Sequence, residues 1–153
     1  MVKKGSKAPD FKLPGSDGKE HSLNDYSKKY LVLYFYPRDM TPGCTMEANA
    51  FNKSISNIRK LNAEVVGVSN DDLERHDRFS QKCDLDFVLL SDTKNKAIKA
   101  YGAYGDRGIF GKGTLRNTYI IKNGKVVAAF EKVNPTNHVN VVLKTLKELN
   151  ANK

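Results

Sequence analysis

The amino-acid sequence predicts an α/β fold. One observation is a βαβ unit, in which the apolar runs 30–36 and 64–69 are separated by a segment of helical periodicity. A second is Asn123-Gly124 between two runs rich in β-branched residues, which is a strong signal for a β-hairpin. A third is the amphipathic pattern over 137–149, which predicts a closing helix. Strands and helices therefore alternate along the chain.

Length and composition are those of one globular domain. With 153 residues, the chain is expected to form a single domain over 1–153 that buries a full core without metals or disulfides. No run approaches the roughly 20 apolar residues of a membrane span. The basic start, residues 1–7, leads into no apolar signal core, so we expect no membrane partner and a cytoplasmic location.

The net charge of +9 comes from lysines and arginines that are spread over every segment. A nucleic-acid site would concentrate them on one helix or patch. We therefore expect a solvated basic surface and no specific nucleic-acid partner. A basic binding or holdase protein without turnover stays as an alternative class.

The first half of the chain is predicted from its turn residues and its apolar runs. Residues 8–23 form a short β-hairpin around Ser16-Asp17-Gly18, and a brief helical turn follows. The strand 30–36 is apolar throughout, as is typical of a strand buried on both faces, and Pro37 ends it. A helix is then expected from about Cys44 to about Leu61.

The second half repeats the alternation of strands and helices. A glycine-rich loop over 102–113 contains Tyr104, Ile109 and Phe110 and is too apolar to be only a linker. The other predicted elements are, in order, a strand over 64–69, a helix from Asp71 or Asp72 to about Asp84, a strand over 87–90, a helix from about Lys94 to Tyr101 capped by Ser91-Asp92, strands over 116–122 and 125–131, and the final helix.

Cys44 is expected where a buried strand has just ended and a helix begins. The free backbone N–H groups and the dipole of a helix start favour a negatively charged thiolate. Ionising an ordinary thiol almost completely at neutral pH takes about 3.4 kcal/mol. A helix end supplies about 2 kcal/mol at best. A cation must therefore lie near the sulfur.

The segment that contains Cys44 resembles a known family. Residues 37–44, Pro-Arg-Asp-Met-Thr-Pro-Gly-Cys, fit the peroxiredoxin signature Pro-x-x-x-Thr/Ser-x-x-Cys. The longer string over 34–47 resembles the peroxiredoxin Q branch, also called bacterioferritin comigratory protein, and the resemblance continues from Gly5 to the last helix. It implies a thioredoxin-like fold with a mixed central sheet flanked by helices and an N-terminal β-hairpin extension.

The resemblance also implies an activity. It is that of a thiol-dependent peroxidase that reduces hydrogen peroxide and organic hydroperoxides without metal, haem or flavin. Thioredoxin or a similar thiol reductant is the implied electron donor. We expect a monomer, with a dimer as the alternative. The related glutathione peroxidases are disfavoured because they use a Trp in the site and this chain has none.

Within this resemblance, Cys44 is the candidate peroxidatic nucleophile, whose thiolate attacks a peroxide oxygen and becomes sulfenic acid. Thr41 is expected to orient the peroxide oxygens, and Pro37 to roof the pocket. Arg116 is the candidate cation, reaching the sulfur from a neighbouring strand, and Glu47 is expected to orient it by ion pairing. The structural alternatives are a buried core cysteine, a helix cap, a strand terminator and a surface arginine.

The second cysteine departs from the commonest pattern of the branch. Many members carry a resolving Cys five residues after the first, where this chain has Asn49. Cys83 is then the candidate resolving partner, although it falls about 40° from Phe79 on a helical wheel and could be a packing residue. Because a disulfide needs Cα atoms within roughly 7 Å, Cys44 would have to leave its pocket. The alternative is a one-cysteine enzyme reduced by an external thiol.

Besides the binding or holdase protein, one other class follows from the same residues: a thiol–disulfide oxidoreductase or redox sensor on the same fold. We expect no metal, because His21, His76 and His138 are far apart and none is paired with another ligand at metal spacing.

Overall fold

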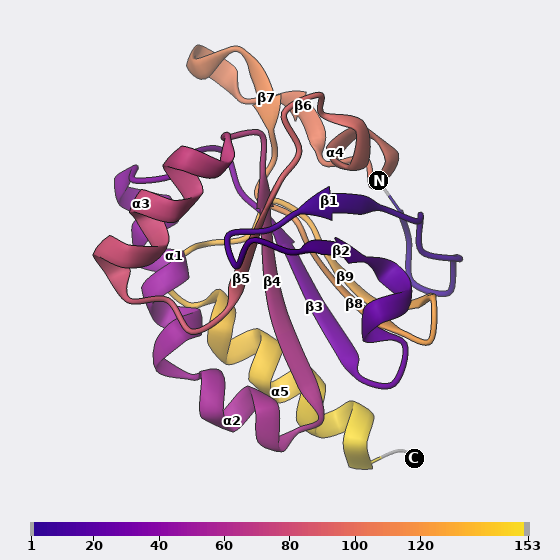
Figure 1. Cartoon of the computed structure of the whole chain (residues 1–153). Coiled ribbons are helices and arrows are strands. Elements are labelled where there is room, and N and C mark those ends of the chain that lie inside the picture. Colours follow the sequence, from indigo (N-terminus) through magenta and orange to yellow (C-terminus); the bar gives the residue numbers. More distant parts are fainter. Residues whose placement is uncertain (1, 152–153) are drawn as a thin grey trace.

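A five-stranded mixed sheet forms the centre of the molecule, as seen in the computed structural model, which describes residues 2–151 (Figure 1). The strand order is β5-β4-β3-β8-β9. Strands β3, β4 and β5 are parallel, whereas β8 runs antiparallel to β3 and β9 antiparallel to β8. The strands are β3 Tyr30–Phe35, β4 Ala63–Ser69, β5 Val88–Ser91, β8 Thr118–Lys122 and β9 Lys125–Phe130.

Strand β3 is central because both of its faces are buried. Its alternate residues Tyr30, Val32 and Tyr34 belong to one hydrophobic core, and the residues between them belong to a second core on the opposite face. A strand with water on neither face needs no polar alternation. The uniformly apolar run that the sequence shows is thus explained.

Helices cover both faces of the sheet (Figure 1). The first core lies under four helices: α1 Pro42–Lys53, α2 Ile55–Lys60, α3 Leu73–Cys83 and α5 His138–Ala151. The second core lies under α4 Lys96–Ala100, the short 3-10 helix η1 Leu23–Tyr26 and the N-terminal hairpin of β1 Lys12–Pro14 and β2 Glu20–Ser22. The predicted α/β class, mixed sheet and N-terminal hairpin are confirmed.

Several predicted elements differ from the structure. The single helix expected from Cys44 to Leu61 is wrong: helix α1 begins at Pro42, and Ser54, with φ −99° and ψ 5°, separates it from α2. The Ser54 N–H bonds the carbonyl of Phe51, three residues back, as in a 3-10 turn. Ile55 and Ile58 of α2 belong to the same core as Phe51 of α1.

The glycine-rich loop over 102–113 contains ordered structure. It holds a hairpin of β6 Tyr104–Asp106 and β7 Lys112–Thr114 with a 3-10 turn, η2 Gly108–Phe110, at its tip. Helix α4 begins after Asn95, but the Asp92 carboxylate still accepts the N–H groups of Lys96 and Ile98. The sequence patterns missed these details because the segments are too short for a periodicity.

No helix within residues 2–151 is long and apolar enough to cross a membrane.

His138 begins α5 in the first core. Its ring packs edge-on against Phe51 and Phe130, at centroid distances of 6.1 and 5.4 Å. The residue is 3% exposed, and burial lowers the pKa of His138 from 6.5 to about 4. The imidazole is therefore neutral in the folded protein at neutral pH.

We expect His138 to make the fold acid-sensitive. Between about pH 6.5 and 4 the unfolded chain binds a proton at this residue and the folded chain does not, so stability falls as the pH falls, by up to about 3 kcal/mol. In His138→Leu this contribution is absent. Urea unfolding of both proteins across this range should show the variant gaining on the wild type as the pH drops. A difference that stays constant would contradict the prediction.

Candidate active site

The loop between β3 and α1 places Cys44 at the carboxyl edge of the sheet. Thr41 is the residue before the helix, with extended φ −87° and ψ 155°, and Pro42 occupies the first helical position, where a missing N–H costs no bond. The first bond of the helix runs from the Thr45 N–H to the Thr41 carbonyl, at 2.9 Å. Cys44 therefore lies in the first turn, among the free N–H groups that favour negative charge.

Strand β8 brings Arg116 to the same edge. Because β8 is antiparallel to β3, its first residue, Thr118, lies opposite Tyr34 near the end of β3. The Phe35 N–H donates to the Asn117 carbonyl at 2.8 Å, which extends the pairing by one step. The sequence pattern predicts that Arg116 starts this strand. In the structure, β8 begins at Thr118 and Arg116 lies just before it. Its side chain nonetheless leaves the sheet directly beside the start of α1.

Arg116 joins the sulfur to a carboxylate. Its Nη1 lies 3.6 Å from Cys44 Sγ and 3.0 Å from Glu47 Oε1. Glu47 is three residues after Cys44 and thus on the same face of α1. The Arg116 side chain is 17% exposed, Glu47 is fully buried, and Cys44 is 2% exposed. The structure thus brings together three of the residues that the sequence singled out.

The electrostatics of this group are dominated by burial. Burial raises the pKa of Glu47 to about 7, although Arg116 lowers it. Burial alone would lower the pKa of Arg116, but nearby Cys44 and Glu47 outweigh it and raise that pKa above its ordinary value. The guanidinium therefore stays charged, while the carboxylate beside it titrates near neutrality.

Two further residues of the 34–47 string contribute to the site, although the sequence analysis assigned them no role. A Cβ on Gly43 would lie 3.0 Å from Arg116 Nη2, so only glycine leaves the guanidinium its full space. Burial, with Glu47 and Cys44 next, raises the pKa of Tyr34 well above its ordinary value, so its hydroxyl keeps its proton. Within residues 2–151, the Tyr34 hydroxyl and Glu47 Oε2 are both buried without a hydrogen-bond partner. The signals for Tyr34 in the sequence are its place in that string and its face on the predicted strand.

Thr41 and Pro37 lie where the motif puts them. The Thr41 hydroxyl donates to the Arg38 carbonyl at 2.8 Å, which leaves its oxygen lone pairs able to accept. Thr41 holds the capping position, yet in the described chain its side chain makes no capping hydrogen bond. The helix-cap alternative thus holds for position alone. Pro37 is half-buried, two residues after the end of β3.

Cys83 lies far from Cys44 along the helices. It ends α3, is half-buried, and packs against the core that contains Cys44. The Asn52 side-chain amide donates to the Asp84 carbonyl and accepts from the Asp86 N–H. Because Asp84 directly follows α3, the end of α3 is level with Asn52. Eight residues of α1 from Cys44 to Asn52 span about 12 Å. Both cysteines are free thiols, and burial raises the pKa of Cys83.

Comparisons with known proteins agree on one family. Residues 4–130 match the family model for the AhpC/TSA family. Peroxiredoxin Bcp of Bacillus subtilis is 43% identical over 149 residues, which cover 95% of each chain. A PrxQ structure from Xylella fastidiosa has a TM-score of 0.92 at 32% identity and 97% coverage of each chain. The Xanthomonas campestris bacterioferritin comigratory protein, studied for alkyl peroxide reduction, has a TM-score of 0.87 at 34% identity and 92% coverage of each chain.

Burial of Glu47 should make the free energy of unfolding depend on pH. The folded protein holds a proton on Glu47 up to about pH 7, whereas the unfolded chain releases it near pH 4.5. This stabilising contribution is complete below pH 4.5 and is lost as the pH rises through about 7, by up to about 3 kcal/mol. Glu47→Gln cannot titrate, so it should gain on the wild type over that range in urea unfolding. A gap that does not change with pH would contradict the burial argument.

Proposed function

Because the chain belongs to the AhpC/TSA family, in its peroxiredoxin Q branch, it is a thiol-dependent peroxidase, and we propose that Cys44 is its peroxidatic cysteine. Its substrates are peroxides, and a thiol compound reduces it again. The observation that supports Cys44 is the Arg116 guanidinium 3.6 Å from its sulfur, at the start of a helix.

The charge arrangement favours a reactive sulfur. Two unit charges 3.6 Å apart attract by about 4–5 kcal/mol at an effective dielectric constant of 20. The helix start adds about 2 kcal/mol at best. Together these terms oppose the desolvation cost of a buried thiolate. Because burial keeps Glu47 partly protonated near pH 7, its carboxylate only partly offsets the guanidinium charge at the sulfur.

The chemical step is a displacement at oxygen. The Cys44 thiolate forms an S–O bond with one peroxide oxygen as the O–O bond breaks, and the leaving oxygen takes a proton and departs as water or alcohol. In the proposal, Arg116 stabilises the charge that moves onto the oxygens, and Glu47 holds Arg116 in place. Thr41 accepts a hydrogen bond from the peroxide with its free lone pairs, and Pro37 provides an apolar wall.

The finer features of the activity are proposals as well. Organic hydroperoxides join hydrogen peroxide as proposed substrates, supported by the alkyl peroxide reduction studied in the Xanthomonas relative. Thioredoxin is the proposed reductant, acting on a single-domain monomer that has no specific nucleic-acid partner. An enzyme recycled by thiols needs a reducing compartment, for which we propose the cytoplasm.

Cys83 is the proposed resolving thiol, with direct reduction by an external thiol as the alternative. Cys44 lies about 12 Å along α1 from Asn52, which is level with the end of α3. This exceeds the distance that a disulfide can span between two Cα atoms. Resolution by Cys83 therefore requires local unwinding at the start of α1, at the end of α3, or at both.

Substitutions at Cys44 and Arg116 test the proposed site. Cys44→Ser should abolish peroxide consumption coupled to a thioredoxin system, because an alcohol does not ionise at neutral pH. Arg116→Met should lower kcat/KM for peroxide by about 10²–10³, since it removes the cation and its donors. Arg116→Lys should fall between, because it keeps a charge and loses the planar fork. If Cys44→Ser kept the activity, the assignment of Cys44 as peroxidatic cysteine would be wrong. If the wild-type protein reduced disulfides without consuming peroxide, the oxidoreductase class would be favoured.

Intact mass after one equivalent of peroxide separates the two routes of resolution. A disulfide between Cys44 and Cys83 lowers the mass by about 2 Da, whereas a sulfenic acid raises it by about 16 Da. We expect the loss in the wild type and the gain in Cys83→Ser. A gain in both proteins would establish the one-cysteine route and remove Cys83 from the mechanism.

A further inference from the structure

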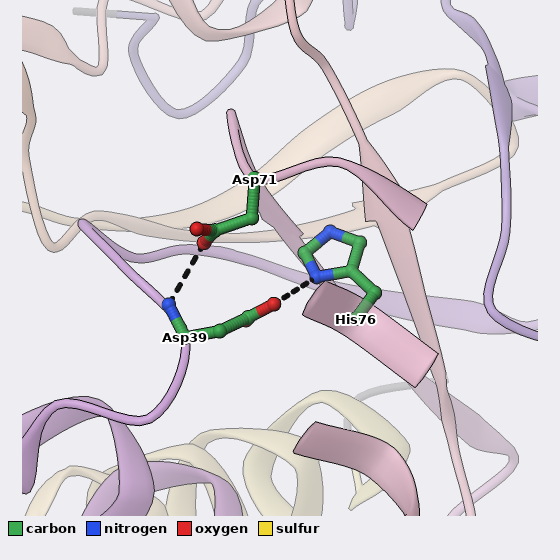
Figure 2. A group of neighbouring side chains, drawn as sticks. All are labelled: Asp39, Asp71 and His76. Carbon is green, nitrogen blue, oxygen red and sulfur yellow. Dashed lines mark hydrogen bonds and ion pairs between the residues drawn. The ribbon is translucent and has the colours of Figure 1, made fainter. Parts of the chain in front are cut away.

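A buried polar cluster lies on the other side of the Cys44 loop from Arg116. It consists of Asp39 in the loop, Asp71 after β4 and His76 on α3. Figure 2 shows the Asp71 carboxylate at the backbone N–H of Asp39 and the Asp39 carboxylate at the His76 ring. Asp39 and His76 have no exposed surface, and Asp71 has 7%. The function proposed above uses none of the three. Buried polar groups of this kind need a physical explanation.

Every polar group of Asp39 is occupied. Its N–H donates to Asp71 Oδ2 at 2.8 Å, and its carbonyl accepts from Arg75 Nη2 at 2.9 Å. Its Oδ1 accepts from the Tyr36 hydroxyl, and its Oδ2 lies against His76 Nδ1, both at 2.5 Å. The loop is therefore attached through this one residue to β3, to the end of β4 and to α3.

Both ring nitrogens of His76 are hydrogen-bonded. Nε2 faces the Leu90 carbonyl at 2.8 Å, and a carbonyl can only accept, so Nε2 donates there. Nδ1 is bonded to Asp39 Oδ2, so the orientation of the ring is fixed from both sides. Asp71 is in turn bonded to Ser69 and Arg75. The cluster thus satisfies its own hydrogen bonds.

The loop that the cluster holds is strained. Met40, the next residue, has φ 62°, a left-handed conformation that costs a non-glycine residue on the order of 1 kcal/mol. Thr41 and the first turn of α1 follow directly. Strain of this kind persists only where neighbouring contacts hold it, and Asp39 provides four such contacts. Releasing Asp39 would therefore free the loop and the start of α1 together.

We propose that the Asp39–His76 contact sets how often Cys44 leaves its pocket, and that His76 is a positioning residue that acts through Asp39. The proposal rests on Cys44 being the peroxidatic cysteine. It links α3, which ends in Cys83, to the loop that must move before any second thiol can reach the Cys44 sulfur.

Two reactions compete for the sulfenic acid. With a thiol R′SH, Cys44–SOH gives the disulfide Cys44–S–S–R′ and water. With a second peroxide ROOH, it gives the sulfinic acid Cys44–SO₂H and ROH, which inactivates the sulfur. A sulfur that is 2% exposed admits a small peroxide more readily than a protein thiol. Opening of the loop therefore favours the disulfide over the sulfinic acid.

The test measures this partition in His76→Gln, Asp39→Ala and the double variant. Each protein turns over with thioredoxin, thioredoxin reductase and rising hydrogen peroxide, and intact mass reports the sulfinic form, about 32 Da heavier than the thiol. Losing one partner of a buried hydrogen bond should raise the peroxide concentration needed for half inactivation at least about fivefold. The double variant should match Asp39→Ala, because both substitutions remove the same Asp39–His76 contact.

His21→Gln is the matched control. His21 also pairs with an aspartate, Asp17 at 2.9 Å, but on the N-terminal hairpin and in part exposed to solvent. Its substitution should leave the inactivation midpoint unchanged. Deuterium uptake by residues 38–46 of the reduced protein should rise in the two cluster variants and not in the control, which ties the effect to the loop.

Several outcomes would overturn the proposal. These are an unchanged or lower inactivation midpoint in the cluster variants, additive effects in the double variant, or unchanged deuterium uptake over 38–46. If His76→Gln or Asp39→Ala fails to fold, Tyr36→Phe replaces it, because it removes only the hydroxyl on Asp39 Oδ1 and should shift the midpoint in the same direction. If Cys44 of the wild type is not oxidised at all, the proposed function fails instead.

Discussion

The site depends on one arrangement of charges, the Arg116 guanidinium held between the Cys44 sulfur and the Glu47 carboxylate. A buried anion is costly unless a cation and hydrogen-bond donors compensate it. The Arg116 guanidinium contacts both groups, and burial keeps the Glu47 carboxylate partly protonated near pH 7. The close approach of the guanidinium in turn requires a glycine at position 43. In the proposed function, this arrangement is what distinguishes Cys44 from an ordinary buried thiol.

The sheet topology makes the arrangement possible. An antiparallel β8 beside β3 delivers Arg116 to the edge where the parallel strands end, and α1 presents its free N–H groups at that same edge. The loop between β3 and α1 is then held from two directions, by Arg116 on the β8 side and by the Asp39 cluster on the β4 side. In the proposed function, the first set of contacts bears on the reactivity of the sulfur. In the further proposal, the second bears on how long the sulfur stays in its pocket.

Local patterns in the sequence were sufficient for most of the fold. The apolar run at 30–36, Pro37 after it and Asn123-Gly124 each specify their own conformation through neighbours in the chain, and the structure has the corresponding elements. The failures are also instructive. The turn at Ser54 and the hairpin over 104–114 are decided by how short segments pack. A strand of three residues is too short to show a hydrophobic periodicity in the sequence.

The sequence by itself determined the α/β class, the position of Cys44 at the start of a helix and the need for a cation near it, because these depend on residues that are adjacent in the chain. Only the tertiary structure decided which groups meet across it: Arg116 with Cys44, His76 with Asp39, and Cys83 level with Asn52. It also decided burial, and with it the pKa of Glu47. Distance and desolvation arise from packing between distant segments, which no local spacing of residues encodes.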